Sequence, residues 1–326
     1  MSIKEEQTNN VSRLLGQKVE YPTTYDKTIL VREERATNRK HLNIEENNLP
    51  FVGFDTWNAY EFTCLLNSGI PVAGILKLCY DCNSKYIVES KSLKLYLNSF
   101  NFYKCGDTIH ETFVNAVNII KHDLSELLET EVSVNIEPIL NYSHSVTGWD
   151  SGTDDTSVQC PDPDKASNTS VDWISLNLWD KGTVFTGDVY NENPDLLKLS
   201  DNQPAKTPQA YWSNTLFSRC KVTKQPDHGD IYIYYDGDKR IDTSSLLQYI
   251  TSLRNECHFH EEICETVYKR LYDLLGAPTD LAVACLFARR GGIDINPVRA
   301  SNKTLLNMLF GDLQNVNKLH AKSMKQ

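Results

Sequence analysis

Cys220 is the residue whose immediate neighbours most favour covalent chemistry. It lies between Arg219 and Lys221, and a nearby positive charge favours the thiolate, which is the nucleophilic form of cysteine. Seven residues later, Asp227 falls in a segment with Pro and Gly that predicts a turn, where a rigid backbone could hold a general acid beside the thiol. Each residue also has an ordinary interpretation, because cysteines often pack as small hydrophobic groups and turns commonly carry aspartate.

A second group could recognise a planar ring. Phe259, His260 and Glu261 offer consecutively a ring for stacking, a titratable imidazole and a carboxylate. A carboxylate pairs well with the adjacent N–H donors of a guanine-like edge, which favours a purine analogue over a keto acid. Glu89 offers a second such carboxylate. Glu261 also lies near the start of a predicted helix, where it could simply complement the helix dipole.

Two basic segments could bind phosphate. Ser90 and Lys91 open a predicted helix after a strand, and Arg290 and Gly291 follow another strand. Both combine cations with hydroxyls or glycines, as phosphate recognition requires, although each could also be a solvated basic turn. The sequence has no Gly-x-Gly-x-x-Gly before a helix and no Walker loop, so a Rossmann domain is not expected.

We expect no metal site. Cys79 and Cys82 form a Cys-x-x-Cys pair, but no second pair follows at a zinc-like spacing and no βαβ context supports redox chemistry. A Ser-His-Asp triad is not favoured either, because no Gly-x-Ser-x-Gly elbow is present.

The elements that must position these residues occur in two similar sets. In the first half we predict strands over 69–78 and 85–88 as a hairpin, an amphipathic helix over 109–127 and a strand over 132–136. In the second half we predict a strand over 231–235, helices over 244–253 and 263–274, and a buried strand over 281–288. This repetition predicts duplicated α+β modules.

Domain boundaries follow from composition. Residues 143–209 are rich in Gly, Asp, Ser, Asn and Pro, which is typical of a connector with short strands at most. We therefore expect an N-terminal module over 1–142, a connector over 143–209 and a C-terminal module over 210–326. The stretch 305–310, near the end of the chain, is expected to be partly helical.

Bulk properties limit the partners. A chain of 326 residues with 40% hydrophobic residues is long enough for two domains. The net charge of −10 argues against a nucleic-acid partner and favours a small molecule. The longest apolar stretches are far shorter than the roughly 20 residues that span a bilayer, so no membrane association is expected. A polar N-terminus and an odd number of cysteines suit a reducing, cytoplasmic location.

Several segments resemble the NADPH-dependent 7-cyano-7-deazaguanine reductases, the QueF family of queuosine biosynthesis. Residues 89–100, ESKSLKLYLNSF, are similar to the family signature, and residues 220–227, 259–261 and 289–297 resemble its remaining motifs in the expected order. Residues 48–51 together with Asp55 and Trp57 match the longer, two-module form. His258 departs from that form, in which we expect an acidic residue, so the pocket rim should differ in charge.

The resemblance implies an α+β protein of two tandem tunnelling folds (T-folds), antiparallel sheets backed by helices, that forms a homodimer. It implies reduction of 7-cyano-7-deazaguanine to 7-aminomethyl-7-deazaguanine with two NADPH per turnover, through a thioimide on Cys220. Asp227 would be the proton donor and His260 would assist it. The remaining roles implied are substrate binding by Val88, Glu89, Ser90, Phe259, His260 and Glu261, and NADPH binding by Ser90, Lys91, Arg290 and Gly291.

Two alternatives remain open at this level. An amidinotransferase of the archaeosine pathway would form the same adduct but add ammonia; the intact segments around Lys91 and Arg290 count against it. The second is a non-catalytic deazapurine binder or a pterin-pathway enzyme of the same fold; the pair Cys220 and Asp227 counts against the binder.

Overall fold

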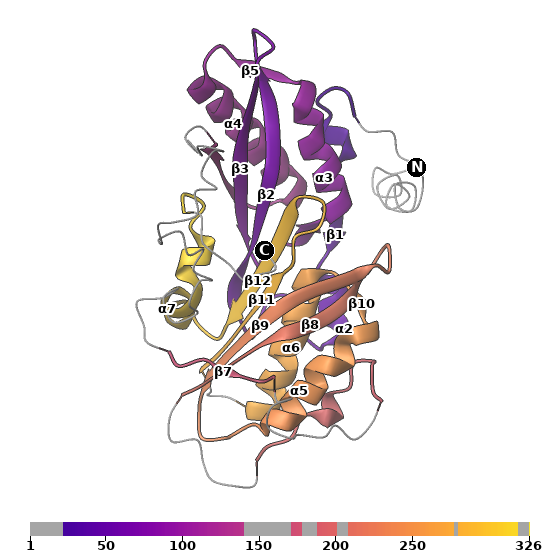
Figure 1. Cartoon of the computed structure of the whole chain (residues 1–326). Helices are drawn as coiled ribbons and strands as arrows, with labels where there is room; N and C mark the ends of the chain where they lie inside the picture. The colour runs from indigo at the N-terminus through magenta and orange to yellow at the C-terminus, as the bar shows by residue number, and fades with distance from the viewer. Residues whose placement is uncertain (1–21, 140–170, 178–187, 201–207, 277–279, 319–325) are drawn as a thin grey trace, which may run out of the picture.

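The computed structural model describes residues 22–139, 171–177, 188–200, 208–276, 280–318 and 326. They form a mixed α+β structure built on one ten-stranded, mainly antiparallel sheet (Figure 1). The strand order along the sheet is β10 (Cys257–His258), β8 (Gln209–Cys220), β9 (Pro226–Asp236), β11 (Asp280–Phe287), β12 (Ile293–Ala300), β2 (Val52–Leu66), β3 (Pro71–Asp81) and β6 (Val132–Pro138). The short strands β5 (Lys104–Gly106) and β7 (Ile174–Ser175) pair with β2 and β8.

The predicted hairpin of strands 69–78 and 85–88 is wrong. Both strands exist, but β4 (Tyr86–Val88) leaves the main sheet and pairs with β1 (Arg32–Glu34). The true partner of β3 is β2, with Asp55 opposite Tyr80 and Trp57 opposite Leu78. The four residues between β3 and β4 therefore redirect the chain rather than close a hairpin.

The remaining predicted elements are confirmed. The helices are α2 (Ala36–His41), α3 (Ser90–Ser99), α4 (Ile109–Leu128), α5 (Thr243–Ser252), α6 (His260–Leu275) and α7 (Lys303–Gln314). Of these, α4, α5 and α6 match the helices expected from apolar spacing, and α7 covers the stretch expected to be helical near the C-terminus. Among the described helices, none combines the length and apolar character that crossing a bilayer requires.

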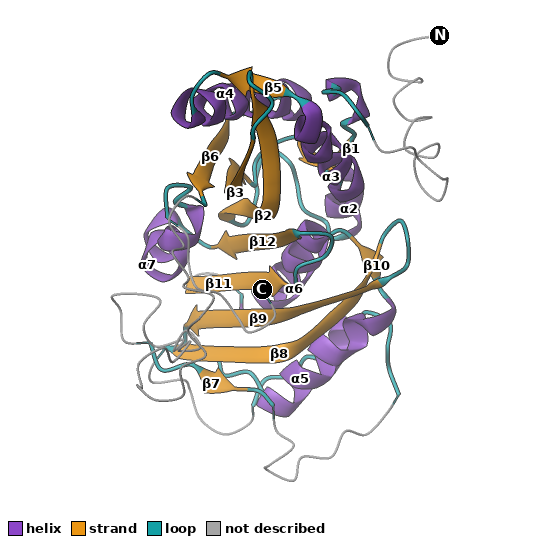
Figure 2. Ribbon diagram, turned by 45° about the horizontal axis from the view of Figure 1, so that its top comes forward, coloured by secondary structure: helices purple, strands orange, loops and turns teal. Residues whose placement is uncertain are grey.

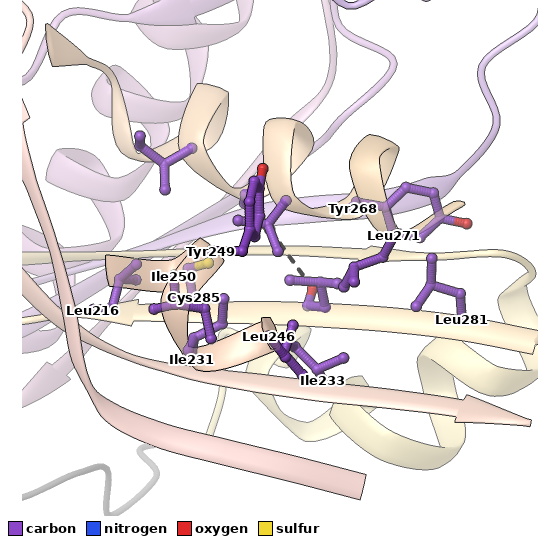
Figure 3. Close-up of a cluster of buried hydrophobic side chains, with 14 of the residues drawn as sticks. Leu216, Ile231, Ile233, Leu246, Tyr249, Ile250, Tyr268, Leu271, Leu281 and Cys285 are labelled. Atoms are coloured by element: carbon purple, nitrogen blue, oxygen red, sulfur yellow. Dashed lines mark hydrogen bonds between the residues drawn. The ribbon is translucent and has the colours of Figure 1, made fainter. Parts of the chain in front are cut away.

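Alternation along the central strands gives the sheet two different faces. Ile293 and Ile295 of β12 point to the side of the first-half core under α3 and α4, whereas Val298 and Ala300 pack beneath α7. Figure 2 shows the helices arranged around this sheet. In the second half, side chains of α5 and α6 meet residues of β8, β9 and β11 in a separate core (Figure 3). Burial of these apolar faces drives both halves to pack on one sheet.

A buried ion network fills the junction between the two cores. Arg299 of β12 contacts Asp55 at 2.8 Å and Glu265 of α6 at 2.8 Å. Arg35 contacts Asp55 at 2.5 Å, and Arg39 contacts Glu265 at 2.8 Å. Buried charges are tolerated only when they are paired in this way. The network thus joins β2, β12, α6 and the segment around α2 at one place.

Candidate active site

A cavity of about 410 Å³ lies at the junction, between the N-terminal ends of α3 and α6. Both halves of the chain line it, and it contains every site residue predicted above: Val88, Glu89, Ser90, Lys91, Cys220, Asp227, Phe259, His260, Glu261, Arg290 and Gly291. Residues far apart in the sequence therefore share one pocket. Their individual roles remain predictions.

Cys220 ends β8 and is partly exposed at the pocket. Its N–H donates to the Gln225 carbonyl at 2.9 Å and its carbonyl accepts from Lys224 at 3.0 Å, which closes a tight loop. Lys224 has φ of 58°, the left-handed conformation that such a loop needs. Among the described cysteines, only Cys220 and Cys257 are not buried, and only Cys220 lines the pocket. Cys220 is therefore the one described cysteine whose side chain is both partly exposed and at the pocket, and the sequence does not reveal this exposure.

Asp227 lies on strand β9 and not in a turn as predicted, because the turn is completed by residues 221–225. Its side chain is buried, bonded to Arg290 and 3.5 Å from the Nε2 atom of His260. Burial raises the pKa of Asp227, but the His260 and Arg290 contacts outweigh it and leave the pKa below its ordinary value. The carboxylate of Asp227 is therefore ionised at neutral pH, and it must receive a proton before it can donate one.

The pKa of Glu261 is shifted in the opposite direction from that of Asp227. It is buried, and its Oε1 atom has no hydrogen-bond partner in the described part of the chain. Burial, supported by the charge of Asp55 and opposed by Arg35, raises the pKa of Glu261 to about 8. The free pocket therefore holds a neutral carboxylic acid at this position at neutral pH, ready to change state when a ligand supplies donors.

Glu89 has a structural role that the motif did not predict. Its two carboxylate oxygens accept from the backbone N–H groups of Lys91 at 2.9 Å and Ser92 at 2.7 Å, so it caps the N-terminus of α3. Each oxygen keeps a second lone pair. Glu89 can therefore cap the helix and still accept a hydrogen bond from a ligand.

Phe259 precedes α6 as its N-cap residue, and His260 is the first residue of the helix. Lys221 places its Nζ atom 4.9 Å from the centre of the Phe259 ring, and the His260 ring lies 4.0 Å from that of Phe287. His260 is thereby held with Nε2 toward Asp227. The arrangement offers one aromatic wall and one imidazole next to a carboxylate.

Lys94 is a pocket residue that sequence reasoning missed. It lies three residues after Lys91 on α3, so the two ammonium groups share a helix face, and this spacing was the available signal. Burial, followed by the charge of Arg290, lowers the pKa of Lys94. Gly291 has φ of +56°, and a Cβ there would lie 3.4 Å from Lys94 Cδ. Lys91, Lys94 and Arg290 thus form a cationic wall on one side of the pocket.

His258 lies at the rim of the pocket between two carboxylates. Its Nδ1 atom lies 3.1 Å from Glu262 and its Nε2 atom 3.2 Å from Glu256. Burial lowers the pKa of His258, but the two carboxylates outweigh it and raise the pKa to about 9. A protonated histidine therefore stands beside Cys220, with which it pairs in the sheet.

Comparisons with known proteins identify relatives of this chain. A family model described as the N-terminal part of the nitrile reductase 7-cyano-7-deazaguanine reductase matches residues 21–136, and a model described as QueF-like protein matches residues 226–305. Similar proteins include those of Legionella pneumophila strain Corby, 34% identical over 88% of this chain and 89% of the relative, and Coxiella burnetii, 36% identical over 89% and 92%. That of Colwellia psychrerythraea is 35% identical over 88% and 91%. All three relatives carry the name NADPH-dependent 7-cyano-7-deazaguanine reductase.

Proposed function

The chain belongs to the NADPH-dependent 7-cyano-7-deazaguanine reductase family, and from this premise we propose that the pocket at its junction is where the family reaction takes place. The protein is an oxidoreductase that uses NADPH to reduce the nitrile of 7-cyano-7-deazaguanine to a primary amine, in queuosine biosynthesis. One observation carries the proposal for the site: a nucleophile, a proton carrier, two carboxylates and a cationic wall, drawn from both halves, line a single cavity.

Covalent addition comes first. A nitrile carbon is a poor hydride acceptor, and attack by the Cys220 sulfur converts it into the more easily reduced carbon of a thioimide. The S–C bond forms as one C–N π bond breaks, so the nitrogen must gain a proton. Asp227, whose lowered pKa keeps it ionised, accepts the proton of the thiol and passes it to that nitrogen, and His260 assists through its contact with Asp227. No atom is lost in this step.

Recognition rests on the carboxylates. Glu261 and Glu89 accept hydrogen bonds from the N–H donors of the deazaguanine edge, while Phe259 stacks on the ring and the backbone of Val88 and Ser90 completes the wall. Glu261 is buried, so a ring that binds to it is enclosed by the protein. Enclosure excludes water and protects the thioimide from hydrolysis.

The cofactor side of the pocket is cationic. When bound, NADPH supplies a hydride for each of the two reductions between nitrile and amine. Ser90, Lys91, Arg290 and Gly291 would hold it, with Lys94 as a further cation beside the phosphates. After the thioimide carbon has received the first hydride and its nitrogen a proton, the nitrogen lone pair forms a C=N bond as the C–S bond breaks. Cys220 leaves as a thiolate that takes up a proton again, and the resulting imine is the acceptor of the second hydride. Arg290 contacts Asp227, so a phosphate bound by Arg290 would compete with that carboxylate for the guanidinium.

We further propose that residues 1–142 and 210–326 are two T-fold modules joined by the connector 143–209. The support is that each half has a strand hairpin followed by two helices on one face of the sheet. A homodimer is proposed because the described sheet ends at β6, whose open edge can pair with a second copy. The described cysteines are all free, which supports a reducing location such as the cytoplasm.

The assay that tests the function is NADPH oxidation with the nitrile substrate. We expect about two NADPH to be consumed per amine formed, as a four-electron reduction requires. Conversion of the nitrile in the presence of ammonia without NADPH consumption would instead identify an amidinotransferase.

Substrate binding should depend on pH through Glu261. Below its raised pKa of about 8 the free pocket holds a proton that the bound, ionised form has released. Affinity should therefore weaken by about tenfold for each pH unit below that value and level off above it. The dissociation constant of the Cys220→Ala protein, measured by calorimetry between pH 6 and 9 in two buffers, checks this and counts the released proton. A pH-independent constant would show that Glu261 does not change its protonation on binding.

Lys91→Ala should raise KM for NADPH by about tenfold with a smaller effect on the KM for the nitrile, because one charged contact to phosphate is lost. Lys121→Ala, an exposed lysine on α4 paired with Glu131, is the matched control and should leave both constants unchanged. An unchanged KM for NADPH in Lys91→Ala would mean that the cofactor lies elsewhere.

A further inference from the structure

Trp57 lines the pocket, yet the proposed reaction gives it no role. It lies on β2, its side chain is 1% exposed, and its indole Nε1 atom has no hydrogen-bond partner among the residues that the structure describes. An indole N–H can only donate, and a buried donor without an acceptor is costly. An acceptor on a ligand in the pocket would remove this cost.

Glu261 is a second pocket residue with an unsatisfied buried atom. Its Oε1 atom has no hydrogen-bond partner in the described part of the chain, so Glu261 and Trp57 do not satisfy each other. The indole N–H is a donor, whereas the carboxyl group of Glu261 becomes a pure acceptor when it ionises. A ligand that satisfies both residues must therefore offer an acceptor as well as N–H donors.

The sheet register places Trp57 and Glu261 at the same end of the pocket. Trp57 is opposite Ile295 of β12, and both of these residues line the pocket. Further along β12, outside the pocket, Arg299 bonds Glu265 of α6 at 2.8 Å. Glu261 precedes Glu265 by one turn on the same face of α6, and it lines the pocket again. Going back one turn along the helix therefore leads from Arg299 toward Ile295, the strand neighbour of Trp57.

The deazaguanine ring carries an acceptor in the right place. When Glu261 accepts from the ring N–H and the amino group, the carbonyl oxygen of the ring lies directly beside that N–H. The carbonyl oxygen cannot bond to the carboxylate, so it needs a donor from the protein. The cationic wall is proposed to hold the cofactor, and the Nε2 atom of His260 lies 3.5 Å from Asp227. The indole N–H of Trp57 is a donor that serves no other acceptor in the described structure.

We propose that Trp57 is a specificity residue, whose indole N–H donates a hydrogen bond to the ring carbonyl oxygen of the bound deazaguanine. The inference rests on the proposed function of the pocket. Glu261 recognises the N–H donors of the ring and Trp57 recognises the neighbouring acceptor. Together they select a guanine-like ring over an adenine-like ring, which has an amino group in place of the carbonyl. Both atoms are buried, so the side chains that cover them move aside as the ring enters.

The first test measures two ligands on two full-length proteins, Cys220→Ala with and without Trp57→Phe. The ligands are 7-cyano-7-deazaguanine and its thiocarbonyl analogue, which keeps the N–H donors but has sulfur, a weak acceptor, in place of the carbonyl oxygen. With Trp57 present, we expect the dissociation constant of the analogue to be about tenfold higher, the worth of one buried hydrogen bond. With Trp57→Phe, the two ligands should differ by less than about threefold, because the two partners of one contact are not additive.

The ratio between the two ligands separates the hydrogen bond from packing, because the smaller Phe ring loosens the pocket for both of them. The matched control is Trp212→Phe on β8, whose ring stacks on Tyr232 and does not line the pocket. It should keep the tenfold preference for oxygen. An equal preference for oxygen over sulfur in Trp57→Phe and in its parent protein would overturn the proposal.

The second test observes the unsubstituted indole by NMR, and it does not depend on the folding of Trp57→Phe. The chain has five tryptophans, so the Trp57 N–H signal of the nitrogen-labelled Cys220→Ala protein can be assigned by substituting the other four in turn. We expect its proton to shift downfield on adding 7-cyano-7-deazaguanine, to shift less with the thiocarbonyl analogue and to stay in place with NADP⁺ alone.

A Trp57 signal that does not move with the deazaguanine, or that moves only with NADP⁺, would overturn the proposal. Wild-type protein that fails to reduce the nitrile would instead refute the proposed function itself, so the two failures are distinguishable.

Discussion

Cys220→Ala should abolish reduction of the nitrile while leaving substrate binding intact. Loss of the nucleophile removes the only route to a thioimide, so we expect turnover to fall by at least about 10⁴-fold. The absorbance of the covalent adduct should disappear as well. The dissociation constant should change little, because the carboxylates and the aromatic wall that hold the ring are untouched. Steady-state NADPH oxidation and equilibrium binding together measure the two effects.

Cys257→Ala is the matched control. Cys257 is the other partly exposed cysteine, and it lies on β10 next to β8, but it does not line the pocket. Its removal should leave turnover and adduct formation unchanged. Turnover that persists in Cys220→Ala, or that is lost only in Cys257→Ala, would contradict the assignment of the nucleophile.

Asp227→Asn should give the second largest loss, a fall of about 10²- to 10⁴-fold in the rate of adduct formation. An amide has nearly the shape of the carboxylate but cannot carry the proton from the thiol to the nitrile nitrogen. The pKa of Asp227 is lowered chiefly by His260 and Arg290 against the effect of burial, so in the wild type the active carboxylate form persists to low pH. Stopped-flow absorbance with excess substrate and no NADPH isolates this step.

Asp236→Asn is the control on the same strand. Asp236 ends β9 at the far side of the sheet from the pocket and is exposed. It should leave the rate of adduct formation unchanged. If Asp227→Asn formed the adduct at the wild-type rate, the proton would have to travel by another group, and His260 would be the first candidate to examine.

Much of the site could be predicted from sequence because its residues are grouped in short motifs. The segment that begins at Glu89 places a helix cap, a hydroxyl and a cation within three residues, and α6 begins with its ring, imidazole and carboxylate in order. The helices α4 and α6 were also predictable, since a single apolar face at helical spacing packs on the sheet.

Strand β2 shows why the rest could not be predicted. It is long, it pairs with β3 and β12, and it alternates Trp57 and Ala59 on one face with Thr56 and Asn58 on the other. Both faces are buried, one by a core and one by the polar contacts under α7, so no simple apolar alternation marks it as a strand. Without a signal for β2, the sequence pattern leaves β4 as the apparent partner of β3, whereas the structure pairs β3 with β2.

The buried ion network at the junction could not be predicted from the sequence either. Arg39 and Glu265 bond to each other across 226 residues of sequence, and no local spacing predicts such a pair. Burial has the largest effect on the pKa of Glu261, and the charges of Asp55 and Arg35 in this network act on it next. No motif of the sequence contains these two charges.

The most direct measurement is the intact mass of the wild-type protein after mixing with 7-cyano-7-deazaguanine in the absence of NADPH, followed by a chase with NADPH. We predict an increase equal to one substrate molecule per chain, peptide mapping that assigns it to Cys220, and its discharge by NADPH as 7-aminomethyl-7-deazaguanine. Absence of any adduct, an adduct on another residue, or an adduct that ammonia discharges and NADPH does not, would contradict covalent nitrile reduction in this pocket.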